Sequence, residues 1–500
     1  MMKVIAVYTD TQFSSPIMYT FDLMLSVLGV EYRVIPYSET ALGGIDSGDL
    51  LISYGHRRVD PVADYQIHIY QSRLFSGDYK TSSSMPHLPL KHWNGLPVIY
   101  EGNGDMGDLV AQSGNLVETN IDVIASSFFM VSRYEEIILD VEDKHGRFPA
   151  KASIAHKEDF LSRPIVNEYI DLLCRWIQNL RPDFQRKKLW ADRDFAVSLT
   201  HDVDNIRKYR WWCPPLNSLA RTAKRGQLGK TLHYVWDWLL SSSGGRTDPY
   251  WNFDKIVALE HEYGFRSSFY FLAGGDTKYD RRYSINNPKI IALIEKLEDM
   301  GHEVGLHGSY SSSSDYEKFM SEKRKLDQVV SSKQYGGRYH YLRWTAPDTW
   351  RILEGSGILY DTTLGYAEHA GFRCGICLPF RPFDVLEDRM MDLWEIPLIA
   401  MEQGLFGYQN LSPDEVSEEI QRLIDVNERH GGVFVTLWHN DCFYRLDNPD
   451  ALQLYQRMLD YINSKNALCG TVRDALSIWL KAVEPDDTHL LIQQCNKGCL

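Results

Sequence analysis

Short apolar runs alternate with segments of helical spacing along most of the chain. In the first part, the apolar runs have the length and the flanking polar residues that are typical of β-strands. The strands predicted in this way cover residues 4–8, 32–37, 50–54, 66–70 and 97–100, and the helices cover 16–28, 121–139 and 164–180. This order of strands and helices predicts a layered α/β unit with some parallel strand pairing.

The same alternation resumes after the polar segment 181–188, which contains one proline and several basic residues. Such segments are typical of domain boundaries. We therefore predict a smaller α/β domain over residues 1–185 and a second domain over residues 190–485. In the second domain, strands are predicted at 195–200, 267–272, 302–307, 341–344, 393–397 and 432–437. Regular β/α repetition over so long a stretch favours a barrel-like α/β domain.

Acidic, basic and histidine residues stand in or directly after four of these predicted strands. They are His201, Asp202, Asp204, His307, Arg343 and His439. The carboxyl ends of the strands in a β/α barrel meet at one mouth, where catalytic groups collect. Aspartate and histidine together suit zinc, and also manganese, iron or cobalt. The pattern therefore favours a metal-dependent hydrolytic site.

The composition excludes several classes of protein. The 500 residues are 44% hydrophobic and carry a formal net charge of −14. This acidic balance argues against general nucleic-acid binding and against binding to anionic membranes, although a local basic site remains possible. No run approaches the roughly 18 apolar residues that span a bilayer, so we expect no membrane span. The opening residues turn polar too soon for a secretory signal, and we expect a cytoplasmic protein.

Three segments carry a resemblance to a known family. They are Thr200–Asp204, Gly301–His307 and Thr436–His439. With them, residues 193–480 resemble the polysaccharide deacetylase family, which is carbohydrate esterase family four. The resemblance implies a distorted (β/α) barrel of seven or eight strands. The whole chain is similar to a divergent bacterial subgroup with an additional N-terminal α/β domain of unassigned function.

The resemblance also implies roles for individual residues. Asp202 matches the general base, His439 the general acid, and Asp204 and His307 the metal ligands. Arg343 matches the third motif, which would place its guanidinium beside Asp202 and keep that carboxylate ionised. Asp361 is our choice for an orienting acid, with Asp392 and Glu395 as alternatives. A backbone N–H near Tyr310 would stabilise the oxyanion.

One position departs from the family pattern. Ser311 stands where the second motif has its second metal-binding histidine. Because a serine hydroxyl is a poor zinc ligand, another residue must complete the site, and His201 and His439 are the nearest candidates by motif position. We assign His201 as the third ligand beside Asp204 and His307. If no residue completes the site, metal binding is weak or lost.

These observations lead to one main prediction and two alternatives. We predict a metal-dependent hydrolase, with zinc as the first choice of metal, that removes acetyl groups from an N- or O-acetylated sugar or glycan precursor. The first alternative is hydrolysis of an amide or cyclic imide in a compound that is not a sugar. The second is a non-catalytic glycan-binding protein with a degenerate metal site.

Overall fold

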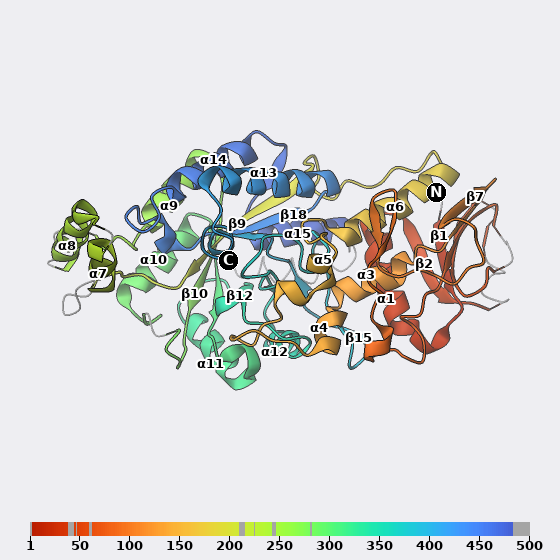
Figure 1. Ribbon diagram of the computed structural model, residues 1–500, viewed down its shortest axis with the longest axis horizontal. Coiled ribbons are helices and arrows are strands. Elements are labelled where there is room, and N and C mark those ends of the chain that lie inside the picture. The colour runs from red at the N-terminus through yellow and green to blue at the C-terminus, as the bar shows by residue number, and fades with distance from the viewer. Residues whose placement is uncertain are drawn as a thin grey trace.

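The computed structural model describes residues 3–38, 45–46, 48–59, 63–209, 216–224, 226–242, 247–280 and 283–483. Figure 1 shows two β-sheets side by side along the longest axis of the molecule, each covered by helices. The N-terminal sheet lies at one end, and the helices α7 and α8 project from the opposite end. The protein is therefore mixed α/β, as predicted.

The N-terminal sheet has six strands in the order β2-β1-β3-β4-β8-β7, with all neighbours parallel except β8 and β7. Its strands are β1 (Lys3–Tyr8), β2 (Glu31–Pro36), β3 (Leu50–Gly55), β4 (Tyr65–Tyr70), β7 (Val110–Ser113) and β8 (Leu116–Thr119). The central strand β3 is buried on both faces, which explains its continuous apolar sequence. The apolar run at 97–100 belongs instead to the small hairpin β5 (Lys91–Trp93) and β6 (Leu96–Val98).

The helices of this part are α1 (Ser14–Leu28), α3 (Val123–Val131), α4 (Tyr134–Leu139), α5 (Ile154–Lys157) and α6 (Ile165–Leu180). The single helix predicted over 121–139 is two helices, α3 and α4. The break falls at Arg133, which has a φ of 53° and lies in the left-handed region. Its buried guanidinium forms an ion pair with Glu136 at 2.8 Å, and tertiary contacts of this kind outweigh helical periodicity.

The second sheet has nine strands, and all its described pairings are parallel. Eight strands follow the order β16-β13-β12-β11-β10-β9-β18-β17, and β19 also pairs with β9. The strands are β9 (Phe195–Val203), β10 (Ser268–Leu272), β11 (Glu303–Gly308), β12 (Gly337–Tyr339), β13 (Tyr360–Asp361), β16 (Trp394–Glu395), β17 (Ala400–Met401), β18 (Val433–Leu437) and β19 (Ala467–Cys469). This curled parallel sheet is compatible with the predicted barrel.

Helices follow most of these strands. They are α9 (Phe253–Glu262), α10 (Pro288–Asp299), α11 (Tyr316–Leu326), α12 (Asp348–Ser356), α13 (Pro413–His430), α14 (Ala451–Asn463) and α15 (Val472–Val483). The helix pair α7 (Leu216–Lys224) and α8 (Leu228–Ser242) is inserted between β9 and α9. A two-stranded ribbon, β14 (Phe383–Asp384) and β15 (Arg389–Met390), lies between β13 and β16 in the chain.

The strand predicted at 341–344 is wrong, and the error matters for the site. The strand is β12, which ends at Tyr339, and Tyr341 and Leu342 have φ values of 65° and 50° in a turn. Gly337 opens this strand and Gly336 precedes it, so the apolar side chains that mark a strand in sequence are missing at its start. A Cβ at Gly336 would lie 2.1 Å from the ring of Tyr360, so close packing requires glycine there.

The two parts share one continuous apolar core, which includes residues from β1 through α15. A buried ion pair also joins them, because Arg373 Nη2 lies 2.7 Å from Glu136 Oε2. The boundary between residues 185 and 190 remains a prediction. Within the described residues, no helix is both long enough and apolar enough to cross a membrane.

Candidate metal and catalytic centre

The alternation of side chains along β9 separates the histidine and aspartates that follow one another in sequence. Residues two apart in a strand share a face, so Thr200 and Asp202 face one side and His201 the other. His201 donates a hydrogen bond to Trp438 O at 2.7 Å, and its Nε2 lies 2.8 Å from Glu260 Oε1 on α9. Both ring nitrogens of His201 are thus engaged away from the aspartates. The predicted metal ligand His201 is therefore corrected to a structural residue.

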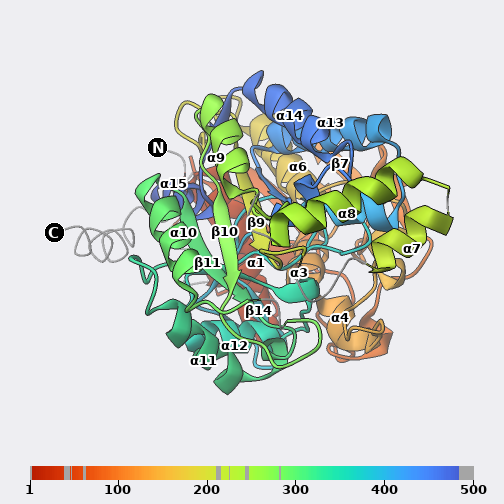
Figure 2. The ribbon, with the colours of Figure 1, turned by 90° about the vertical axis from the view of Figure 1, so that its left-hand side faces the viewer.

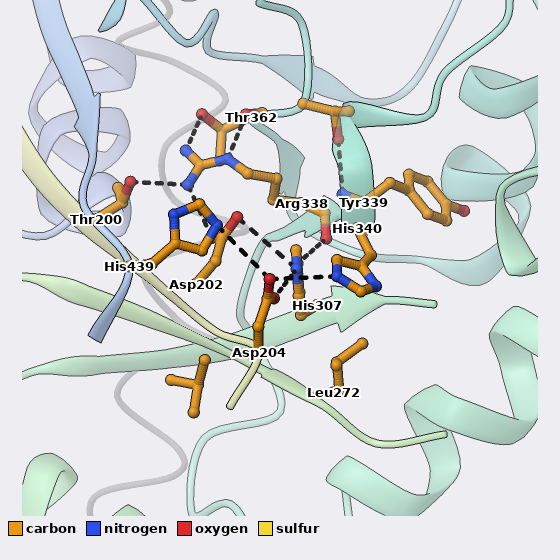
Figure 3. A network of polar contacts seen from close by, with 12 residues as sticks. Thr200, Asp202, Asp204, Leu272, His307, Arg338, Tyr339, His340, Thr362 and His439 are labelled. Atoms are coloured by element: carbon orange, nitrogen blue, oxygen red, sulfur yellow. Dashed lines mark hydrogen bonds and ion pairs between the residues drawn. The ribbon is translucent and has the colours of Figure 1, made fainter. Parts of the chain in front are cut away.

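Asp204, His307 and His340 form a cluster whose ligand atoms all lie within 4.8 Å of one another. His307 Nε2 lies 3.1 Å from Asp204 Oδ1, and His340 Nε2 lies 3.2 Å from Asp204 Oδ2 (Figure 3). Asp204 and His340 directly follow the carboxyl ends of β9 and β12, and His307 is the last residue but one of β11. A carboxylate and two imidazoles are a donor set that suits zinc and other divalent transition metals.

The other nitrogen of each clustered histidine is held by a fixed partner. His307 Nδ1 donates to Arg338 O at 2.8 Å, and His340 Nδ1 lies 2.8 Å from Asp280 Oδ1. Such partners fix the tautomer and leave Nε2 free to face a metal. The residues present therefore fit a divalent cation.

The electrostatics of the cluster also favour positive charge. Burial opposes protonation of His340, but the carboxylates of Asp204 and Asp280 raise its pKa to about 9. Burial favours the neutral form of Asp204, yet the imidazoles of His340, His307 and His439 hold the pKa of Asp204 well below its usual range. A divalent cation would supply the positive charge that these carboxylates stabilise, and the imidazoles would then bind it in their neutral form.

Asp202 is held by Arg338 and not by Arg343. Arg338 Nη1 donates to Asp202 Oδ1 at 3.0 Å and to Thr200 Oγ1 at 2.8 Å, and its Nε donates to Thr362 O at 2.9 Å. Arg338 is only 1% exposed, so its contact with Asp202 is shielded from solvent. The second oxygen of Asp202, Oδ2, faces His307 Nε2 at 3.8 Å. The expected arginine–aspartate pair thus exists, with a different arginine.

Arg343 lies at the junction with the N-terminal part of the chain. Its Nε donates to His145 O at 2.9 Å, and its Nη1 donates to Tyr310 O at 2.8 Å. It therefore fixes the turn around His145 against the second sheet. Arg147, from the same turn, donates to Tyr341 O at 2.7 Å and pairs with Asp143 at 2.7 Å.

A cavity of about 290 Å³ contains the cluster. It is lined by Arg147, Asp202, Asp204, Asn205, His307, His340, Tyr341, Leu342, Ala367, Met401, Gln403, Tyr408, Leu437, His439 and Asp441. Arg147, from the N-terminal part of the chain, contributes to the wall of this cavity. Burial raises the pKa of Asp441 to about 6, with the negative charge of Asp204 also contributing.

His439 lies on the far side of the cluster, with Nε2 at 3.8 Å from Asp204 Oδ2. Its Nδ1 lies 2.6 Å from Oε1 of Glu402, the residue that directly follows β17. Burial disfavours its charged form, but the carboxylates of Glu402, Asp204 and Asp202 raise the pKa of His439 well above its usual value. Glu402 is therefore the carboxylate that orients the ring of His439.

The three acids considered for that orienting role lie elsewhere. Asp361 and Glu395 are fully buried neighbours on β13 and β16, and neither lines the cavity. Burial raises the pKa of Asp361 to about 6 and the pKa of Glu395 well above its usual range. Asp392 is exposed and pairs with Arg381 at 2.8 Å.

Ser311 donates to Asp276 Oδ1 at 2.8 Å on the exposed surface, so it takes no part in the cluster, in line with the expectation that another residue completes the site. One smaller expectation is corrected. Tyr310 N donates to Asp280 Oδ1 at 2.8 Å, which leaves it unable to stabilise an oxyanion. Sequence reasoning missed Arg338, His340, Glu402 and Arg147 as members of the site. The glycine pair before Arg338 was the available signal that a strand ends near His340.

The fold and the site together define an α/β protein with an Asp–His–His cluster at the carboxyl edge of a curled parallel sheet. Residues 5–182 match a family of unknown function, DUF7033. No curated protein matches the chain.

Among solved structures, the chain is similar to a "putative polysaccharide deacetylase" from Mycobacterium smegmatis, with 17% identity, a TM-score of 0.38, and coverage of 57% of this chain and 91% of the other. A CE4 family pseudoenzyme from Bacillus anthracis matches with 10% identity, a TM-score of 0.29, and coverage of 56% and 65%. The Bc1960 peptidoglycan N-acetylglucosamine deacetylase matches with 12% identity, a TM-score of 0.26, and coverage of 56% and 87%.

Proposed function

We propose that the protein is a metal-dependent hydrolase that removes acetyl groups from an N- or O-acetylated carbohydrate. The observation that carries this proposal is the placement of Asp202, held by Arg338, beside the Asp204–His307–His340 cluster in one cavity. The sequence motifs that resemble polysaccharide deacetylases support the substrate class. Tyr341 and Tyr408 in the cavity wall also suit a sugar ring, because aromatic faces cover its C–H groups.

Each group has a role that its position supports. A divalent cation held by Asp204, His307 and His340 would lower the pKa of a water molecule and polarise the acyl oxygen. Asp202 Oδ2 accepts the proton of the attacking water, and Arg338 on Oδ1 orients the carboxylate. His439 donates a proton to the leaving amine or alcohol, and Glu402 orients its ring.

Metal content tests the first part of the proposal. The protein is purified without chelator or affinity-tag metal, and zinc, manganese, iron and cobalt are measured by mass spectrometry. We expect stoichiometric metal in the wild type and its loss in His307→Ala and His340→Ala. Ser311→Ala is the matched control, because Ser311 lies outside the cluster, and it should keep the metal.

Acetate release from N-acetylglucosamine oligomers and O-acetylated sugars tests the second part. Asp202→Asn should keep the metal and lower the rate by about 100-fold or more. If metal is bound but only amides or cyclic imides are cleaved, the first alternative function replaces this proposal. If no metal binds after each of the four metals is offered, the second alternative function, a non-catalytic glycan-binding protein with a degenerate metal site, replaces this proposal.

A further inference from the structure

The helix pair α7–α8 lies in the chain between β9, which ends one residue before Asp204, and α9. In Figure 1 the pair projects beyond the sheet at the end opposite the N-terminal part, and in Figure 2 both helices lie toward the viewer. The pair therefore separates the strand that leads to Asp204 from the next helix of the second sheet. We call it the α7–α8 hairpin.

One face of α8 fixes the hairpin to the rest of the protein. Tyr234 is buried, and its hydroxyl donates to Asp447 Oδ1 at 2.7 Å. It packs with Tyr209, Tyr444 and Trp238 in a small apolar cluster. Lys208 Nζ lies 5.5 Å from the centre of the Tyr234 ring. This face has its partners within the chain.

The opposite face of α8 presents a row of large apolar side chains to solvent. Leu228, Leu232, Trp236 and Leu239 are 70%, 69%, 62% and 46% exposed. Their spacing of four, four and three residues places them in one stripe along the helix. With Leu216 on α7, this stripe holds five of the fifteen large apolar side chains that are exposed in the described part of the chain. So dense a patch on one short hairpin marks an interaction surface.

The charge of the segment identifies what can cover the stripe. Residues 205–246 contain eight lysines and arginines and one acidic residue, Asp237, whereas the whole chain has a net charge of −14. Asp237 is buried and accepts a hydrogen bond from Tyr444 at 2.8 Å, so its charge is not presented to solvent. An apolar stripe in a basic segment is the composition of helices that lie in the interface of an anionic bilayer. Like charge opposes pairing of this surface with a second copy of itself.

We propose that the α7–α8 hairpin docks the protein on the surface of an anionic lipid bilayer. The stripe of Leu228, Leu232, Trp236 and Leu239 lies at the boundary between headgroups and acyl chains. Lys224 and Lys230 interact with lipid phosphates. This inference goes beyond the proposed hydrolase activity and does not depend on it.

Co-sedimentation of the full chain with sucrose-loaded vesicles tests the proposal. One set contains phosphatidylcholine alone, and the other contains about one third phosphatidylglycerol. We expect binding to the phosphatidylglycerol vesicles, weak binding to phosphatidylcholine alone, and weaker binding as salt rises from about 0.05 to about 0.5 M. The double variant Leu232→Ser/Trp236→Ser should lower the partition coefficient by about tenfold or more.

Two further variants make the test specific. Leu386→Ser/Leu452→Ser removes two exposed leucines outside the hairpin and should bind like the wild type. Lys224→Gln/Lys230→Gln should weaken binding to the vesicles and reduce the dependence of binding on salt. If circular dichroism shows that the serine variant is unfolded, this lysine variant takes its place as the test of the hairpin. The proposal is overturned if the wild type does not sediment with phosphatidylglycerol vesicles, or if the hairpin and control variants bind equally. It is also overturned if the wild type is a dimer that the hairpin variant dissociates and neither binds vesicles.

Discussion

Arg338 donates a 3.0 Å hydrogen bond to Asp202, and the same residue accepts the hydrogen bond from His307 through its main-chain oxygen. One residue thus holds both the candidate base and one candidate metal ligand. Because Arg338 and Asp202 are almost fully buried, each charge depends on the other for stabilisation.

Arg338→Met should therefore destabilise the protein. Removing one partner of a buried ion pair leaves the Asp202 carboxylate uncompensated, and we expect the free energy of unfolding in urea to fall by about 3–5 kcal/mol. Arg343→Met is the matched control, since Arg343 mainly contacts main-chain oxygens near the surface. A loss in Arg343→Met as large as that in Arg338→Met would contradict the assignment.

His201→Gln should keep the metal. His201 contacts Glu260 and Trp438 O, so its loss weakens a buried hydrogen-bond network without touching the cluster. We expect the free energy of unfolding to fall by about 1–3 kcal/mol, while metal content stays equal to that of the wild type. Metal loss in folded His201→Gln would restore His201 as a ligand. The comparison is with His340→Ala, measured by the same mass spectrometry.

The Asp361–Glu395 pair should make stability depend on pH. Burial raises the pKa of both carboxyl groups in the folded state, so the folded protein holds a proton that the unfolded chain releases above about pH 4. The contribution of this proton to the free energy of unfolding is therefore fully present below about pH 4. It is lost as the pH rises through about 6, the pKa of Asp361 in the folded state, and above.

The expected slope is about −1.4 kcal/mol per pH unit for one proton, measured as the free energy of unfolding in urea across this range. Glu395→Gln removes one of the two acids and should flatten the profile. Asp392→Asn, on an exposed acid, should leave the slope of the wild type unchanged. An equal slope in Glu395→Gln would show that the pair does not share a proton.

Arg147→Ala should weaken substrate binding if the cavity takes an acetylated sugar. Arg147 lines the cavity from the N-terminal part and lies outside the metal cluster. Loss of a charge-assisted contact should raise KM by about tenfold with little change in kcat. Arg163→Ala, which breaks a pair with Glu168 outside the residues that line the cavity, should leave both constants unchanged. A fall in kcat alone would instead assign Arg147 to the chemical step.

The strongly periodic elements could be predicted from the sequence. The sequence Ser412-Pro413-Asp414-Glu415 has the spacing of a capping box. The helix α13 begins there at Pro413, with Ser412 Oγ accepting a hydrogen bond from Glu415 N and the Glu415 carboxylate accepting one from Ser412 N. The apolar strands β9, β11 and β18 also lie where they were predicted. These signals are local, and a few neighbouring residues are enough to produce them.

Residues in short strands escaped prediction. β12 has three residues and begins with glycine, and β17 has two residues, so neither has a usable period. His340 and Glu402 follow these two strands. The order of the strands in the sheet brings them next to Asp204 and His439, and that order depends on contacts between distant segments.

The sequence by itself determined the α/β class, the position of several strands, and the aspartates and histidines that follow them. Only the tertiary structure decided which histidine completes the cluster and which arginine holds Asp202. The physical reason is that alternation along β9 sends His201 to the helices and Asp202 to the cavity. Strand β12 ends at Tyr339, before the predicted strand begins, and this places Arg338 and His340 where Arg343 and His201 were expected to act.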